Sequence, residues 1–96
     1  MRIYIKENSL IARFAAWKMN SSQIAIVIGR TIHLHNTTRR EFVGNKRSLN
    51  HEMEHIRQYR KYGLIRFIVL YLVETTRKGY RNNKFEVAAR AAEEYA

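Results

Sequence analysis

The stretch KRSLNHEMEHIRQYRKYG, residues 46–63, decides the fold because it predicts one long helix with two different faces. Apolar residues recur through it at helical spacing and form the face expected to be buried: Leu49, Met53, Ile56 and Tyr59. Gly63 ends the helix as a C-cap residue. The other elements are therefore expected to pack around this helix.

The residues before this helix predict a small sheet with one helix. Residues 2–6 alternate apolar and polar side chains, as a short strand does, and Asn8-Ser9 caps a helix over residues 10–19. Its apolar positions, at helical spacing, are Leu10, Phe14 and Trp17, with Ile11 beside them. Residues 24–28 and 31–35 predict a hairpin that turns at Gly29-Arg30. Residues 36–40 follow as a polar loop or the start of a helix.

Two further helices are predicted after Gly63. An apolar helix spans residues 64–78, a loop follows Gly79, and a last helix spans residues 84–95. Strand, helix, hairpin and three helices together predict a single α+β domain. Residues 1–45 form its upper helix and sheet part, and residues 46–96 its helical part.

Composition limits the classes of function. The chain has 96 residues, no cysteine, and a net charge of +10 from 18 Lys and Arg against 8 acidic residues, all of them Glu. Without cysteine there is neither a disulfide nor a thiolate metal site. The positive charge suits a polyanion such as nucleic acid or a membrane surface. The basic residues are scattered and no nucleic-acid motif accompanies them, which favours a solvated basic surface.

The first residues, MRIYIK, lack the apolar core and cleavage site of a secretory signal. The longest apolar stretch, residues 64–73, is interrupted by Arg66 and is shorter than the ~20 residues of a membrane-spanning helix. These patterns predict no transmembrane segment and a cytoplasmic location.

The predicted helix over residues 46–62 carries the residues that suggest chemistry. His51 and His55 stand four residues apart, so both imidazoles lie on one face and can bind one zinc ion. Glu52 lies one residue along, where it can take a proton from a metal-activated water instead of binding the metal. The pattern H-E-x-x-H therefore predicts a zinc site.

A catalytic zinc ion needs three protein ligands and one open position. The third ligand must come from another element, and six residues are candidates: His33, His35, Glu74, Glu86, Glu93 and Glu94. The two histidines point to one face of their predicted strand. Glu86 lies in the first turn of the last predicted helix, where small residues allow close helix packing.

Two stretches, HEMEHIRQY (51–59) and GYRNNKFEVAAR (79–90), resemble the small gluzincin-like metallopeptidases, also known as minigluzincins. That family shows H-E-x-x-H-x-x-Q on an active-site helix, then an asparagine-containing loop and F-E-x-x-A on a glutamate helix. The resemblance implies a zinc-dependent peptidase in which His51, His55 and Glu86 bind the metal and Glu52 is the general base. It also implies an upper edge strand, here residues 31–35, that holds a peptide substrate.

Further residues are needed around such a site. An oxyanion formed during peptide hydrolysis needs a hydrogen-bond donor. Tyr80 is favoured because it precedes Glu86 on the loop, with Tyr71 and His33 as alternatives. Gln58 and Asn50 are near enough in sequence to hold the free imidazole nitrogens, although the sequence does not choose between them.

Other functions stay open at this point. One is a catalytically silent metal-binding protein, or a latent precursor in which residues 91–96 cover the cleft and Glu94 or Tyr95 takes the open metal position. Another is a basic nucleic-acid-binding protein, which would bind with steep salt dependence and hold no metal. Apolar faces left exposed on so small a chain also suggest a homodimer.

Overall fold

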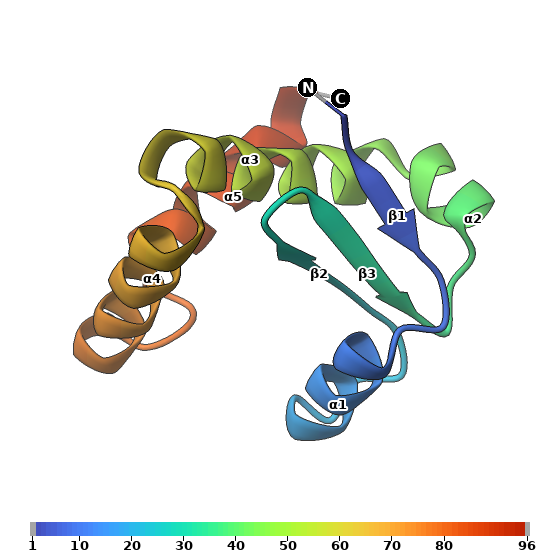
Figure 1. Cartoon of the computed structure of the whole chain (residues 1–96), viewed down its shortest axis with the longest axis horizontal. Coiled ribbons are helices and arrows are strands. Elements are labelled where there is room, and N and C mark those ends of the chain that lie inside the picture. The colour runs from blue at the N-terminus through green and yellow to red at the C-terminus, as the bar shows by residue number, and fades with distance from the viewer. Residues whose placement is uncertain (1, 96) are drawn as a thin grey trace.

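A three-stranded sheet and five α-helices make up residues 2–95, the part of the chain that the computed structural model describes (Figure 1). The elements, in chain order, are β1 (Tyr4–Lys6), α1 (Leu10–Lys18), β2 (Ile24–Ile28), β3 (Thr31–His35), α2 (Arg39–Gly44), α3 (Lys46–Tyr62), α4 (Leu64–Lys78) and α5 (Lys84–Ala92). A 3-10 turn over Glu93–Tyr95 ends the described part. The predicted α+β class is confirmed.

The strand order is β1–β3–β2, so β3 lies in the centre of the sheet. β1 runs parallel to β3, with Tyr4 opposite Thr31, and β2 pairs with β3 in an antiparallel hairpin. The prediction that residues 31–35 form a substrate-holding edge strand is therefore wrong, because β3 is paired on both sides. Within residues 2–95 the two outer strands, β1 and β2, each have one free edge.

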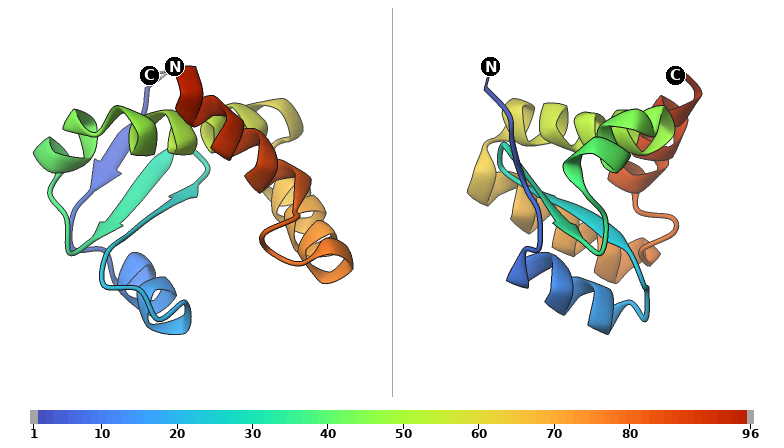
Figure 2. Two further views of the ribbon diagram at one scale, coloured as in Figure 1. Left: turned by 180° about the vertical axis from the view of Figure 1, so that it is seen from behind. Right: turned by 90° about the vertical axis from the view of Figure 1, so that its right-hand side faces the viewer.

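The two faces of the sheet carry different helices. The face toward α3 forms the main core, in which three strand residues, Val27, Ile32 and Leu34, pack with Phe42 and Ile56. Helix α1 lies on the opposite face (Figures 1 and 2). The sheet therefore separates α1 from α3.

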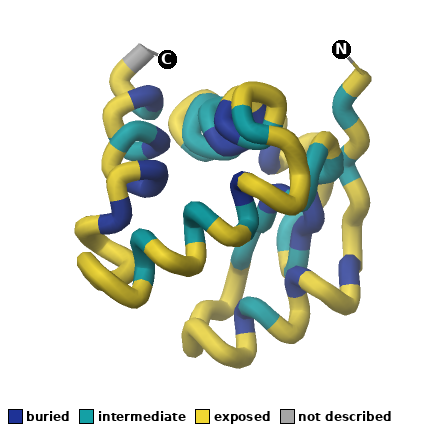
Figure 3. The backbone as a smooth tube through the Cα atoms, turned by 60° about the vertical axis from the view of Figure 1, so that its left-hand side comes forward, coloured by how far each residue is buried: buried dark blue, intermediate teal, exposed yellow. Residues whose placement is uncertain are grey.

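Helix α1 buries its small residues and exposes its large ones. Ala12 and Ala16 are buried, whereas Leu10, Phe14 and Trp17 are exposed, as the mostly exposed colouring of this helix in Figure 3 illustrates. The apolar residues follow the helical spacing predicted for them, but the stripe they form does not face the sheet.

Helix α2 was predicted only as a loop or the start of a helix. Thr38 caps it, and the Thr38 and Glu41 side chains each accept a hydrogen bond from the other residue's backbone N–H, which is a complete capping box. The helix holds Phe42 in the core. Its signal, a threonine followed three residues later by a glutamate, was present in the sequence.

The helices after residue 45 form the other half of the molecule. Gly63 has φ of +86°, a value that side-chain-bearing residues rarely adopt, and it lets the chain turn sharply from α3 into α4. Helix α4 projects away from α3, and α5 crosses back and packs against α3 (Figure 2). Within residues 2–95, no helix is long and apolar enough to cross a membrane.

Candidate metal centre

Helix α3 presents His51 and His55 on the face that the sheet leaves free. Ile56 and its apolar neighbours turn one side of the helix to the sheet. The two imidazoles therefore point to another side, with ring centroids 5.1 Å apart. The i,i+4 spacing places them one turn from each other, as the sequence predicted.

Glu86 reaches the same point from α5, because the start of that helix is anchored by Asn83. The buried Asn83 side chain accepts a hydrogen bond from the Phe85 N–H (2.8 Å) and donates to the Tyr71 carbonyl (3.1 Å) and to Thr75 Oγ1 (2.9 Å). The start of α5 is thereby held against α4. Sequence reasoning missed this anchor, although an asparagine directly before a helix is a capping signal.

The Glu86 carboxylate lies between the two histidines. Its Oε1 atom is 3.2 Å from the Nε2 atoms of both His51 and His55. One ligand atom from each of the three residues lies within 4.8 Å of the other two. The three side chains are thus placed so that they could hold one metal ion.

The remaining polar atoms of the three residues also have partners. Glu93 Oε2 lies 2.7 Å from His51 Nδ1, and Gln58 Oε1 lies 2.9 Å from His55 Nδ1. The Tyr71 hydroxyl donates to Glu86 Oε2. These contacts direct both Nε2 atoms toward Glu86, and they fix each ring's orientation.

Of the two residues predicted to hold the imidazole nitrogens, Gln58 contacts one of them and Asn50 does not. Gln58 contacts His55 and also donates to the Phe85 carbonyl at 3.1 Å, which ties the site to the start of α5. Asn50 has no hydrogen bond to either imidazole within residues 2–95. Glu93, which the sequence suggested only as a candidate metal ligand, takes the second position and reaches His51 Nδ1 from the turn after α5.

Charge in the cluster favours protonated histidines and an ionised Glu86. Burial alone would lower the pKa of His51, but Glu86, Glu52 and Glu93 together raise it to about 9. Burial would also lower the pKa of His55, but the hydrogen bond with Glu86 and the charge of that carboxylate outweigh burial, so the pKa is raised. Burial would raise the pKa of Glu86, but hydrogen bonds from both histidines and from Tyr71 lower it well below the ordinary value.

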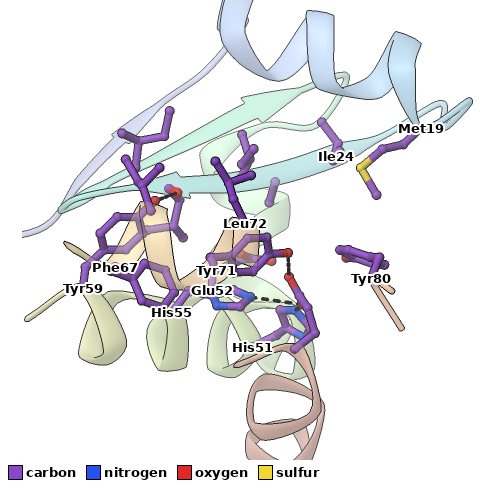
Figure 4. A pocket seen from close by; sticks show the side chains of 16 residues that line it. Met19, Ile24, His51, Glu52, His55, Tyr59, Phe67, Tyr71, Leu72 and Tyr80 are labelled. Atoms are coloured by element: carbon purple, nitrogen blue, oxygen red, sulfur yellow. Dashed lines mark hydrogen bonds and ion pairs between the residues drawn. The ribbon is translucent and has the colours of Figure 1, made fainter. Parts of the chain in front are cut away.

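Glu52 lies beside the cluster without entering it (Figure 4). Burial raises its pKa to about 7, against the opposing effect of the His55 and His51 charges. A carboxyl group with such a pKa can both accept and donate a proton near neutral pH.

A cleft of about 350 Å³ opens above the cluster. One wall is the whole of β2, and the other is formed by α4 residues that include Phe67, Ile68 and Leu72 (Figure 4). Tyr71 and Tyr80 also line the cleft. The Tyr71 hydroxyl is engaged with Glu86, whereas Tyr80 is half exposed, and burial together with the Glu86 charge raises its pKa to about 12.

The other candidate ligands lie elsewhere. His33 faces α1, with its Nδ1 2.8 Å from Ser9 Oγ, and burial lowers its pKa. His35 shares that face of β3, as predicted, but the face is turned away from α3. Glu74 accepts a hydrogen bond from the Lys84 N–H at 3.2 Å.

The C-terminal residues proposed to cover the cleft are described only in part. Glu94 is exposed and lies 3.6 Å from Arg47, away from the three clustered side chains. The Tyr95 side chain and residue 96 lie outside what the structure describes.

Comparison with known proteins identifies no relative of this chain. The chain matches no family model, no curated protein and no solved structure. What it does must therefore be inferred from the cluster and the cleft themselves.

Proposed function

We propose that this chain is a zinc-dependent peptidase of the gluzincin type. The observation that carries the proposal is the meeting of His51, His55 and Glu86 at the floor of a cleft whose wall is an unpaired strand edge. The three possible ligands thus lie next to a strand edge that an extended peptide could pair with, and this arrangement supports the proposal.

The donor set favours zinc. Two imidazoles and one carboxylate are typical ligands of catalytic zinc, and ligand atoms 2.0–2.1 Å from a tetrahedral zinc ion lie about 3.3 Å from one another. The separation of 3.2 Å between Glu86 Oε1 and each Nε2 atom is close to that value. Oxygen-rich sites for magnesium or calcium differ from this set.

Each residue near the cluster would have a separate role. His51, His55 and Glu86 would hold the zinc ion, which when bound supplies a Lewis acid and lowers the pKa of water. Glu52 would accept a proton from the attacking water and pass it to the leaving amine, and its pKa of about 7 suits both transfers.

The negative oxygen that develops during hydrolysis needs a donor. Tyr80 lines the cleft, and its pKa of about 12 keeps the hydroxyl protonated at neutral pH. The Tyr71 hydroxyl is already engaged with Glu86. Tyr80 is therefore the residue that we assign to this role.

The free edge of β2 would hold the peptide by strand addition. In a hairpin closed by two residues, Ile28 and Thr31 exchange hydrogen bonds, so the backbone groups of Ala25 and Val27 point away from β3. The Tyr59 hydroxyl donates to the Val27 carbonyl at 3.1 Å, which agrees with that direction. Both polar groups of Ala25 and the Val27 N–H remain for a substrate.

Metal content tests the first half of the proposal. We expect about one zinc ion per chain in the purified protein supplied with zinc, and loss of that zinc in His51→Ala and Glu86→Ala. Glu74→Gln is the matched control, because Glu74 is a partly buried glutamate outside the cluster. Absence of stoichiometric zinc from the unaltered protein would refute the proposal.

Cleavage of unfolded protein substrates tests the second half. The zinc-loaded chain should hydrolyse peptide bonds, and Glu52→Gln should remove that activity while keeping the zinc. A zinc-loaded protein that cleaves no peptide across a broad peptide library would be a silent metal-binding protein instead.

A further inference from the structure

Helix α1 is built with its apolar side facing outward. Leu10, Phe14 and Trp17 are 77%, 61% and 73% exposed, whereas the helix meets the sheet through Ala12 and Ala16. Positions i, i+4 and i+7 lie on one face of a helix. The three large side chains therefore form one continuous outward stripe, which we name the α1 stripe.

The α1 stripe has no role in the core or in the candidate metal centre. Phe14 and Trp17 contact each other, with ring centroids 5.9 Å apart, but leave most of their surface to solvent. Contiguous exposed apolar side chains of this size mark interaction sites more often than isolated ones do. We therefore expect a binding partner to cover the α1 stripe.

Charge indicates what kind of partner fits. Arg13 and Lys18 are exposed on either side of the α1 stripe, since steps of 100° place them about 60° and 80° from Leu10 in opposite directions. No acidic residue lies on α1, and the chain carries a net charge of +10. Lys18 Nζ lies 5.7 Å from the Trp17 ring centroid, so a cation accompanies the more exposed of the two aromatic residues in the stripe.

We propose that the α1 stripe docks the protein onto the interface of an anionic lipid bilayer. An apolar strip with an aromatic residue and basic residues at its margins matches the boundary between acyl chains and anionic headgroups. A second copy of the chain matches less well, because two stripes in contact would bring Arg13 and Lys18 of each copy together. The helix lies on the membrane and does not span it, having nine residues.

Docking in this way is independent of metal binding and of catalysis, so its failure and the failure of the peptidase proposal are separate results. The stripe adjoins the cleft at one end, since Met19, the C-cap residue of α1, lines the cleft. A docked molecule would hold the cleft close to the bilayer.

Trp17 provides the experiment, because it is the only tryptophan in the chain. Vesicles made of equal parts phosphatidylcholine and phosphatidylglycerol should shift its fluorescence to shorter wavelength, and the protein should float with them in a density gradient. Vesicles of phosphatidylcholine alone should produce little of either effect. Binding that is equal for both compositions, or absent from both, would overturn the proposal.

Variants locate the binding surface. Leu10→Ser with Phe14→Ser should lower the affinity for the anionic vesicles at least about tenfold while keeping the Trp17 signal. The matched control is Val43→Ser with Val87→Ser, two exposed apolar residues on α2 and α5, which should bind unchanged. Equal losses in both pairs would show that the stripe is not the contact.

The charge variant keeps the test decisive if the apolar variant does not fold. Arg13→Gln with Lys18→Gln should weaken binding to anionic vesicles, and 0.5 M salt should weaken binding of the unaltered protein. Chain mass in solution, from light scattering, gives the remaining outcome. A dimer that the Leu10→Ser, Phe14→Ser variant converts to a monomer, together with no vesicle binding, would assign the stripe to a second copy.

Discussion

Zinc binding is expected to weaken at least about fiftyfold when the pH falls from 9 to 7. A histidine must be neutral to bind zinc, and neighbouring carboxylates raise the pKa of His51 to about 9. About half of His51 is neutral at pH 9 and about one hundredth at pH 7, so this residue alone lowers the apparent affinity about fiftyfold, or about 2.3 kcal/mol. The pKa of His55 is raised as well, which steepens the dependence further.

Competition with a chromophoric chelator measures this affinity at pH 7, 8 and 9 without free zinc in excess. Calorimetry in two buffers with different ionisation enthalpies counts the protons released, and we expect more than one at pH 7. An affinity that changes less than about threefold across this range would refute the reasoning, because it would mean that the carboxylates hold no proton on His51.

A pair of adjacent glutamates offers a control. Both glutamates pair with Arg47, at 3.2 Å and 3.6 Å, but only Glu93 also lies 2.7 Å from His51 Nδ1, and Glu94 is exposed. Glu93→Gln should move the pH dependence of zinc binding to lower pH, and Glu94→Gln should leave it in place. The same shift in both variants would point to long-range charge and not to the contact with His51.

Four further results follow from the contacts described. In the metal-free protein, His51 stabilises the fold below its unfolded pKa of 6.5, and this contribution disappears as the pH rises to about 9; the melting temperature, followed by circular dichroism, should fall across that range. Ile56→Ala should lower the free energy of unfolding by about 2–5 kcal/mol in urea denaturation, and a loss under about 1 kcal/mol would contradict its place in the core. Gln58→Leu should weaken zinc binding about 10- to 100-fold in the chelator assay, because His55 loses its partner; unchanged binding would leave Gln58 no such role. Tyr80→Phe should lower kcat of peptide cleavage about a hundredfold with zinc content unchanged, and an unaltered kcat would remove Tyr80 from the reaction.

The parts of the fold that depend on local patterns were predictable. Helix α3 and its two histidines follow from spacing within a few residues, and the glycine after it marks where it ends. The last helix was predicted to run to residue 95, but α5 ends at Ala92 and a 3-10 turn follows. That turn carries Glu93, whose hydrogen-bond contact with His51 depends on where α5 ends.

The errors concern choices between distant partners. Nothing local decides that β1 pairs with β3, about 27 residues away, and so the central strand was mistaken for an edge. Helical spacing likewise identified the apolar positions of α1 but not which side of that helix meets the sheet. Small alanine side chains allow a close approach there, and the large residues are left outside.

The free edge of β2 also bears on how the chain avoids self-association. Its sequence, Ile-Ala-Ile-Val-Ile, contains no charge and no proline, and exposed edges of that kind promote the strand-to-strand stacking of aggregates. Here the edge lies inside a cleft, opposite the α4 residues Phe67 and Leu72. The Tyr59 hydroxyl also donates a hydrogen bond to the Val27 carbonyl of this edge. Helix α4 therefore lies opposite an edge of the kind that promotes stacking when it is exposed, and a variant that loosens α4 is expected to aggregate faster.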